Sequence, residues 1–273
     1  DYEQAKSLIA PVAEKGAPQA QAGIALMYYE GKGFPHDYAE AAKWFRDAAE
    51  QGLPYASHVL ALMYHKGQGL KQDYTQAVKW YRLAGEKGYG PSQNNLALMY
   101  YQGKGVTQNY KKTIKWLRPA AEKGLGQSQY TLGWMYYKGL GLEQDPEEAA
   151  KWFRRAAEQG FAKAQTNLGI MYLKGKGISQ NYDQAAKWLR LAADNGRELA
   201  QVNLGLMYLK GRGLPNDYDK AAEYFTLAAI QGNVLAREKL TMIYENKLIT
   251  PQYKTYANKR YNLSRLNSQI AKY

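Results

Sequence analysis

The chain has 273 residues, 45% of them hydrophobic, and a formal net charge of +13. It contains no cysteine, which excludes disulfide bonds, cysteine-based metal sites and cysteine nucleophiles. No apolar run approaches the roughly 18 residues that a membrane-spanning helix needs, and no signal-like segment opens the chain.

A fixed period of 36 residues organises the sequence. Self-similarity at such a period is typical of a solenoid, in which each repeat buries its apolar face against its neighbours. Positions are numbered below by the first complete repeat, so that position 26 comprises Leu26, Leu62 and their equivalents. A Met-Tyr pair followed by Gly-x-Gly marks the copies, with methionines at Met27, Met63, Met99, Met135, Met171 and Met207.

The chain begins halfway through a repeat, because Asp1-Tyr2 aligns with Asp37-Tyr38. We therefore expect residues 1–16 to form the second helix of a truncated repeat, with the N-terminus of the protein outside this chain. Residues 233–273 are expected to form a degenerate repeat and a basic capping helix. The six complete repeats are 17–52, 53–88, 89–124, 125–160, 161–196 and 197–232.

Each repeat contains signals for two helices. The first helix is predicted over about 20–30 and ends at Gly31, since glycine adopts the left-handed conformation that closes a helix. The second helix begins after Asp37, whose side chain can cap the exposed amides. In four repeats a Glu or Gln three positions later predicts a capping box. Those residues are Glu40, Gln76, Glu148 and Gln184.

The last segment departs from the repeat. Lys247 occupies the glycine position, and Pro251 starts a further helix with one apolar face. A capping helix is the simplest interpretation, because solenoids need an atypical closing element. The alternative is a basic amphipathic helix on a membrane surface. The apolar face would hold Tyr256, Leu263, Leu266 and Ile270, and the cations are Lys247, Lys254, Lys259, Arg260, Arg265 and Lys272.

The repeat pattern resembles the Sel1-like repeat, a relative of the tetratricopeptide repeat. Residues 167–172 (Asn-Leu-Gly-Ile-Met-Tyr) and 185–188 (Ala-Ala-Lys-Trp) match it closely, and the resemblance covers about residues 1–240. It implies an all-α, right-handed solenoid superhelix of antiparallel helix pairs, with the first helices on the concave side, and a role as an adaptor or scaffold. Members are often exported by bacteria, and some from Legionella act on host entry and trafficking. We accordingly expect a periplasmic or secreted bacterial protein with a role in virulence.

Specific binding is predicted where the repeats differ. Positions 22, 26 and 29 point about 180° away from the core position Ile24, which makes them candidates for a concave, aromatic groove. The alternative is that position 26 packs inside the superhelix. The predicted partner-binding residues are Tyr29, His58, His65, Asn94, Leu98, Tyr101, Tyr130, Trp134, Tyr137, Ile170, Leu173 and Leu209.

Charge offers a second candidate surface, because Lys and Arg recur at positions 43 and 46 of the second helices. A solvated ridge is one interpretation, and binding of an anionic lipid such as phosphoinositide is the other. Nucleic acid is disfavoured, since its recognition signatures are missing. The candidate anion-binding residues are Lys79, Arg82, Lys111, Lys112, Lys115, Arg118, Lys151 and Arg154.

Catalytic constellations are missing from the sequence. No phosphate-binding loop follows a strand, and His58 and His65 lie about 10 Å apart along one helix, too far to share a metal ion alone. We therefore expect no enzyme activity, metal or cofactor. The predicted function is a monomeric scaffold that binds a partner protein, and the alternative is a peripheral membrane adaptor.

Overall fold

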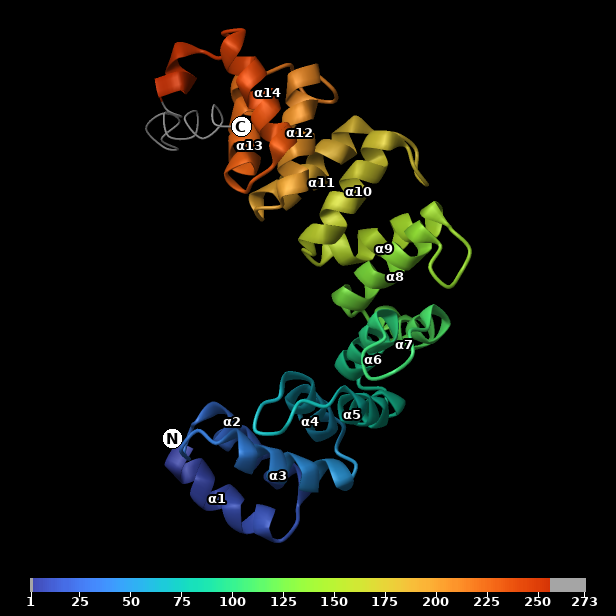
Figure 1. The fold of residues 1–273 in the computed structure, drawn as a ribbon, viewed down its shortest axis with the longest axis vertical. Helices are drawn as coiled ribbons and strands as arrows, with labels where there is room; N and C mark the ends of the chain where they lie inside the picture. Colours follow the sequence, from blue (N-terminus) through green and yellow to red (C-terminus); the bar gives the residue numbers. More distant parts are fainter. Residues whose placement is uncertain (1, 256–273) are drawn as a thin grey trace. The chain divides into compact units, whose positions relative to one another are not determined.

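A computed structural model describes residues 2–255 (Figure 1). Over that range the chain is all-helical, and consecutive helices contact each other up to residue 122 and again from residue 146. The first helices of the repeats are α2 (Pro18–Glu30), α4 (Pro54–Lys66), α6 (Gly90–Gln102), α8 (Gly126–Lys138), α10 (Ala162–Lys174), α12 (Glu198–Lys210) and α14 (Val234–Glu245). The second helices are α1 (Tyr2–Glu14), α3 (Tyr38–Glu50), α5 (Tyr74–Glu86), α7 (Tyr110–Glu122), α9 (Pro146–Glu158), α11 (Tyr182–Asp194) and α13 (Tyr218–Ile230).

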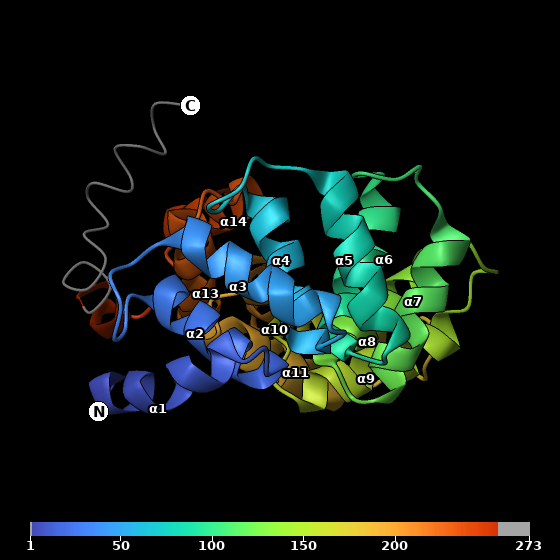
Figure 2. The same ribbon diagram turned by 90° about the horizontal axis from the view of Figure 1, so that it is seen from below.

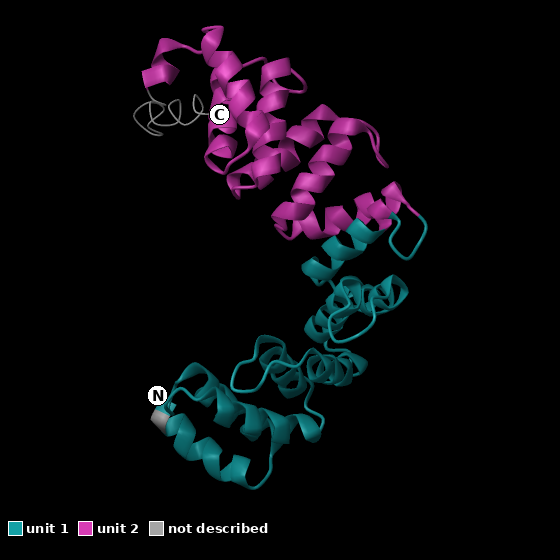
Figure 3. Cartoon of the chain, in the orientation of Figure 1, with its two compact units in different colours: residues 1–135, 139–143 teal, residues 136–138, 144–273 magenta. Residues whose placement is uncertain are grey.

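The chain divides into two compact units, which Figure 3 distinguishes by colour. Unit 1 comprises residues 1–135 and 139–143, and unit 2 comprises residues 136–138 and 144–273. Inside unit 1, the paired helices α2 and α3 lie side by side in two perpendicular views (Figures 1 and 2). The predicted fold of antiparallel helix pairs is therefore confirmed within each unit.

Local signals place the helix ends where the sequence predicts them. Gly31 adopts φ 68° and donates its N–H to the Met27 carbonyl, which closes α2. Asp37 caps α3 by accepting hydrogen bonds from the amides of Ala39 (2.8 Å) and Glu40 (3.0 Å). The later second helices α5, α7, α9, α11 and α13 repeat this arrangement with an Asp or Asn side chain at the N-cap.

The predicted capping box is wrong in its second half. The amide of Asp37 donates to the Tyr28 carbonyl at 3.1 Å, so it has no need of the Glu40 side chain. Glu40 instead pairs with Lys43. In α9, Glu148 likewise pairs with Lys151 at 3.0 Å. The acidic residue of the motif thus stabilises the exposed side of its own helix.

The second glycine of Gly-x-Gly permits close contact between repeats. Gly69 lies against the start of α3, where an added Cβ would stand 2.3 Å from the Tyr38 carbonyl carbon. Gly105 lies in the same way against Tyr74, at 2.4 Å from its carbonyl oxygen. Both glycines also have positive φ, of 66° and 68°. Only glycine meets both requirements at this position.

The periodic aromatic residues form the core between helices. Trp80 and Trp152 are 6% and 5% exposed, and Phe45 and Tyr81 are fully buried. Trp116 packs directly on Gly85 of the preceding second helix, where a Cβ would lie 3.1 Å from its ring. These residues therefore belong to packing, not to a binding surface.

The C-terminal segment is described only as far as residue 255. Lys247 adopts φ 54°, so it takes the left-handed conformation that glycine provides elsewhere. Thr250 is held by Asp219 of α13, which accepts from its amide at 2.8 Å and from its hydroxyl at 2.6 Å. A helical turn over residues 251–255 follows. The predicted apolar face from Tyr256 to Ile270, together with Lys259, Arg260, Arg265 and Lys272, lies outside the described residues.

Candidate functional site

At position 22, two of the residues predicted to line an open groove, His58 and Asn94, are buried. His58 and Asn94 are only 9% and 6% exposed. The Nδ1 atom of His58 lies 2.8 Å from the Ser92 hydroxyl oxygen, and the Ser128 hydroxyl donates to the Asn94 side-chain oxygen at 3.0 Å. Each residue therefore joins its first helix to the first helix of the next repeat. The assignment of these two residues to a groove is wrong, because their polar atoms are used between repeats.

Positions 26 and 29 remain partly accessible on the first helices. The position-29 side chains pack against their own second helix, as for His65 edge-on to Tyr74 at 5.3 Å between ring centroids and for Tyr101 tilted against Tyr110 at 5.5 Å. Tyr29 also donates its hydroxyl to Gln68 of the next loop at 3.1 Å. The half-buried members of the predicted set are Tyr29, His65, Leu98, Tyr101, Tyr130, Trp134, Tyr137, Ile170, Leu173 and Leu209.

Two further positions on the same helices were missed. Position 19 is the most exposed, with Tyr55 at 37% and Leu199 at 49%. Position 23 holds half-buried asparagines at Asn95, Asn167 and Asn203. Positions 19, 23 and 26 follow one line along a helix, and position 29 flanks it. We call these four positions the first-helix stripe. An asparagine recurring beside apolar residues was the sequence signal for it.

Each unit carries its own part of the stripe. In unit 1 it includes Leu62 and His65 on α4, and Leu98 and Tyr101 on α6. In unit 2, α10 and α12 contact each other directly and place Ile170, Leu173, Leu206 and Leu209 on the stripe. Tyr137 is additionally held by Phe153 at 6.4 Å between centroids and lies under the Lys176 ammonium at 4.3 Å.

The two histidines of α4, His58 and His65, are kept neutral by their surroundings. Burial lowers the pKa of His58 to about 4. Burial also lowers the pKa of His65, and the nearby charges of Lys104 and Lys66 lower it further. Neither imidazole carries a positive charge at neutral pH. Among the described residues, no cluster of His, Asp or Glu could hold a metal ion.

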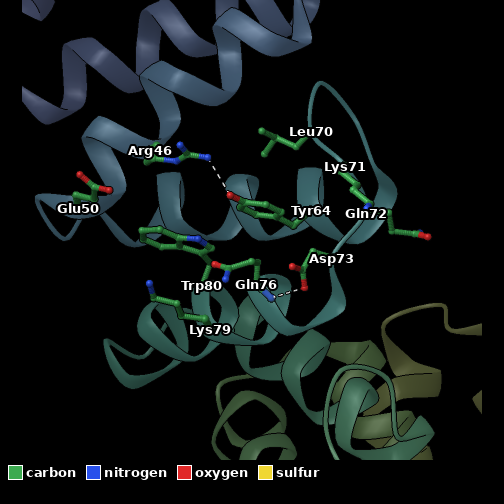
Figure 4. A pocket seen from close by; sticks show the side chains of 10 residues that line it. All are labelled: Arg46, Glu50, Tyr64, Leu70, Lys71, Gln72, Asp73, Gln76, Lys79 and Trp80. Atoms are coloured by element: carbon green, nitrogen blue, oxygen red, sulfur yellow. Dashed lines mark hydrogen bonds between the residues drawn. The ribbon is translucent and has the colours of Figure 1, made fainter.

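The arginines of the predicted basic ridge serve a structural purpose. Arg46 donates a hydrogen bond to the Tyr64 hydroxyl of the following repeat at 2.9 Å, as Figure 4 shows. Such a bond joins position 46 to position 28 of the next copy, and we call it the Arg–Tyr clamp. It recurs for Arg82 with Tyr100 (3.0 Å), Arg154 with Tyr172 (2.7 Å) and Arg190 with Tyr208 (3.0 Å).

The lysines of the ridge stay at the surface but differ in their neighbours. Lys151 pairs with Glu148 at 3.0 Å, whereas Lys79 lies over the Trp80 ring at 5.3 Å. Lys112 lies over the Tyr100 ring at 5.4 Å. Helix α7 is the most basic of the second helices, and Glu122 is its only acidic residue. The exposed candidate cations are Lys79, Arg82, Lys111, Lys112, Lys115, Arg118, Lys151 and Arg154.

Open clefts lie beside the second helices, between a helix and the Gly-x-Gly loop of the next repeat. One of about 550 Å³ is bordered by Arg46, Glu50 and Tyr64 on one side and by Lys79 and Trp80 on the other (Figure 4). Others of about 800 and 340 Å³ lie along α9 and α11. No sequence pattern predicted these clefts, because each forms only where two repeats meet.

None of the helices within residues 2–255 is both long and apolar enough to span a membrane.

A family model for the Sel1 repeat matches residues 18–53, 54–89, 90–125, 126–161, 162–196 and 199–233. We found no match among curated proteins.

Two solved structures resemble the chain over most of its length. One is c5321, a protective antigen present in uropathogenic Escherichia coli strains that displays an SLR fold, with 39% identity and a TM-score of 0.85 over 90% of this chain and 52% of that chain. The other is a Sel1 repeat protein from Oxalobacter formigenes, with 34% identity and a TM-score of 0.74 over 89% of this chain and 70% of that chain. The chain therefore spans about half the length of the E. coli protein.

Proposed function

Because the chain belongs to the Sel1 repeat family, whose members are generally protein-interaction scaffolds, we propose that it binds a partner protein through the first-helix stripe. The observation that carries the proposal is the run of accessible apolar side chains on consecutive first helices. In unit 2 these include Ile170 on α10 and Leu206 on α12, which are half-buried, and Leu199, which is 49% exposed. A row of apolar side chains at the surface is typical of an interaction site.

The polar residues of the stripe suit an extended segment of the partner. Asn203 donates its side-chain amide to the Leu199 carbonyl at 2.7 Å, which leaves its oxygen able to accept a hydrogen bond. Asn167 holds the same position on α10. Asparagine side chains can pair with the backbone of a bound chain while apolar neighbours contact its side chains. The stripe thus offers both kinds of contact in the three repeats that carry Asn95, Asn167 and Asn203.

Site-specific photo-crosslinking tests the proposal. A photoreactive residue at Ile170 or Leu206 should capture the partner, and the same residue at Leu191 on the exposed side of α11 should not. Leu191 is a matched control, since it is an apolar residue of unit 2 with 41% exposure. Equal capture from Leu191 and from the stripe would reject the stripe as the binding surface.

We extend the proposal to a bacterial factor that is exported and acts on host entry or trafficking. The support is the likeness to a protective antigen of uropathogenic E. coli. Crosslinking should then recover a host protein when the purified chain is incubated with host-cell lysate, and the Leu191 control should recover none. Recovery of bacterial proteins alone would reject this extension but leave the stripe itself standing.

Anionic lipid is the second candidate ligand, and helix α7 favours it. Lys111, Lys112 and Lys115 are exposed there, with Glu122 as the only carboxylate of the helix. Such a basic surface attracts phosphoinositide headgroups without any apolar insertion. Binding of this kind should vanish at high salt, whereas binding through the first-helix stripe should persist.

A further inference from the structure

A cleft of similar construction recurs beside α5, α9 and α11. In each copy a lysine at position 43 and an arginine at position 46 border the cleft, and the floor consists of a small or apolar residue at position 42 and an apolar residue at position 34 of the next loop. The α5 copy has a volume of about 340 Å³. Its cations are Lys79 and Arg82, and its apolar residues are Val78, Leu83 and Val106.

The Arg–Tyr clamp fixes one cation of this cleft in place. Arg82 donates through Nη2 to the Tyr100 hydroxyl at 3.0 Å, and Tyr100 is only 5% exposed. A guanidinium has five N–H donors, so the remaining ones stay available to a ligand. Lys79 stands one helical turn away, with its ammonium over the Trp80 ring. The arginine is therefore oriented before any ligand binds, which lowers the entropic cost of binding.

The α5 copy differs from the others in lacking a carboxylate. Glu147 and Glu158 line the α9 copy, and Asp183 and Asp194 line the α11 copy. In the α5 copy, position 39 is Thr75 and position 47 is the exposed Leu83, while Glu86 does not line the cleft. The two cations are thus uncompensated inside this cleft, and they border an apolar floor.

We propose that the α5 cleft binds the C-terminal residue of a partner protein, when that residue is apolar. Its free carboxylate would accept charge-assisted hydrogen bonds from Lys79 and Arg82, and its side chain would pack on Val78, Leu83 and Val106. Only a chain terminus carries a carboxylate and an apolar side chain on one residue, since Asp and Glu lack the apolar group. The volume lies at the small end of ligand sites, which suits one or two residues better than a long acyl chain.

A methyl-labelled full chain tests this site by NMR titration. The probe is an acetylated pentapeptide of glycine and serine that ends in leucine, used with a free carboxylate or as its carboxamide. The carboxylate peptide should shift the methyl signals of Val78 and Val106 and leave Leu214 of the α11 copy unchanged. The carboxamide should bind at least about tenfold more weakly, since it removes the charge.

A matched pair of variants separates recognition from folding. Thr75→Asp places at position 39 the acidic residue of the α11 copy, and it should weaken binding of the carboxylate peptide by about fivefold or more. Thr75 is exposed in the first turn of α5, where aspartate favours the helix, so a loss of binding would not arise from unfolding. Thr75→Asn has nearly the same shape without the charge and should keep the affinity within about twofold.

Four outcomes would overturn the proposal. The carboxamide could bind as well as the carboxylate, or Thr75→Asp could bind as well as Thr75→Asn. The Val78 and Val106 methyl signals could stay unchanged up to about 5 mM peptide, which corresponds to a free energy of binding too small for a specific site. Octanoate could bind as tightly as the peptide, which would assign the cleft to a fatty acid. The site is separate from the first-helix stripe, so its failure leaves the proposed function standing.

Discussion

Two junctions between first helices of unit 1, α4 with α6 and α6 with α8, are polar, whereas those of unit 2 are largely apolar. In unit 1, His58 meets Ser92 and Asn94 meets Ser128. At the same position in unit 2, the Thr166 hydroxyl turns back to the Ala162 carbonyl of its own helix at 2.8 Å, and Val202 is 3% exposed. A buried polar group is costly without its partner, whereas apolar groups fit by shape alone. The packing of the first helices therefore depends on specific polar partners in unit 1 and on apolar shape in unit 2.

Substitution of the second loop glycine should affect both units most strongly. Gly105→Ala in unit 1 and Gly177→Ala in unit 2 would each place a Cβ within 2.4 Å of backbone atoms of the preceding second helix. With the added strain at positive φ, each should lower the free energy of unfolding by roughly 3 kcal/mol or more. Thermal unfolding checks this. If one of the two variants lost only a small part of its free energy of unfolding, the two units would differ in their backbone contacts as well.

Acid should destabilise unit 1 selectively, because His58 and His65, whose pKa values are lowered by burial, both lie in it. His58 has an ordinary pKa of 6.5 when unfolded and about 4 when folded. The contribution of neutral His58 to the free energy of unfolding is complete above pH 6.5. It is lost as the pH falls towards 4, because only the unfolded state then takes up the proton. The loss should total roughly 3 kcal/mol, at 1.4 kcal/mol per pKa unit.

Hydrogen exchange at pH 7 and pH 5 measures this difference. Protection of α4 and α6 should fall with pH more than that of α10 and α12. His58→Gln serves as the control, since it removes the proton-binding group and should flatten the dependence. Equal loss of protection in the two units would contradict the assignment to His58.

Removing one polar partner should lower the free energy of unfolding more at the polar junction of unit 1 than at the apolar junction of unit 2. Asn94→Ala leaves the buried Ser128 hydroxyl without its acceptor and should cost about 1–3 kcal/mol. Thr166→Val in unit 2 removes only a bond within its own helix and should cost under about 1 kcal/mol. Denaturant unfolding of the two variants gives both values. A larger loss of unfolding free energy for Thr166→Val than for Asn94→Ala would contradict the comparison.

The basic surfaces of the two units allow a matched test of lipid binding. Lys115 of α7 and Lys151 of α9 share position 43, but only Lys151 has a carboxylate partner, Glu148. Lys115→Gln should weaken binding to phosphoinositide vesicles by about 1 kcal/mol, and Lys151→Gln by less. Vesicle sedimentation at low salt measures both. Failure of the parent chain to sediment would remove anionic lipid as a ligand of α7.

The smallest effect is expected at the end of unit 2. Lys247 holds a φ of 54°, which costs a residue with a Cβ more than it costs glycine. Lys247→Gly should therefore raise the free energy of unfolding by about 0.5–1 kcal/mol. A decrease in melting temperature would show that the lysine side chain contributes more than its backbone strain removes.

Local signals were enough to predict the helices, because each cap acts within a few residues. Gly31 and Asp37 closed and opened helices as expected. The burial of His58 depends on Ser92, 34 residues away, and no pattern inside one repeat reveals such a partner. The position-29 rings contact aromatic rings of their own second helix and keep partial exposure.

The Arg–Tyr clamp was available in the sequence, although it went unrecognised. Arg46 and Tyr64 are separated by 18 residues, and the same spacing recurs from Arg82 and from Arg154. Periodic cations were assigned to the surface because charge usually belongs there. A search for residue pairs at one constant spacing across repeats would have found the clamp.

The clamp also bears on how such an array changes in length. In each clamp position 46 reaches position 28 of the next copy, so removing the block 161–196 would bring Tyr208 opposite Arg154 in place of Tyr172. A duplicated block would restore its bonds in the same way. At the last junction Thr226 replaces the arginine, and the buried Tyr244 hydroxyl has no hydrogen-bonding partner. Gene duplication or deletion in whole repeats can therefore preserve the clamp among the copies that carry it, whereas the copy that holds Tyr244 has no arginine to bond.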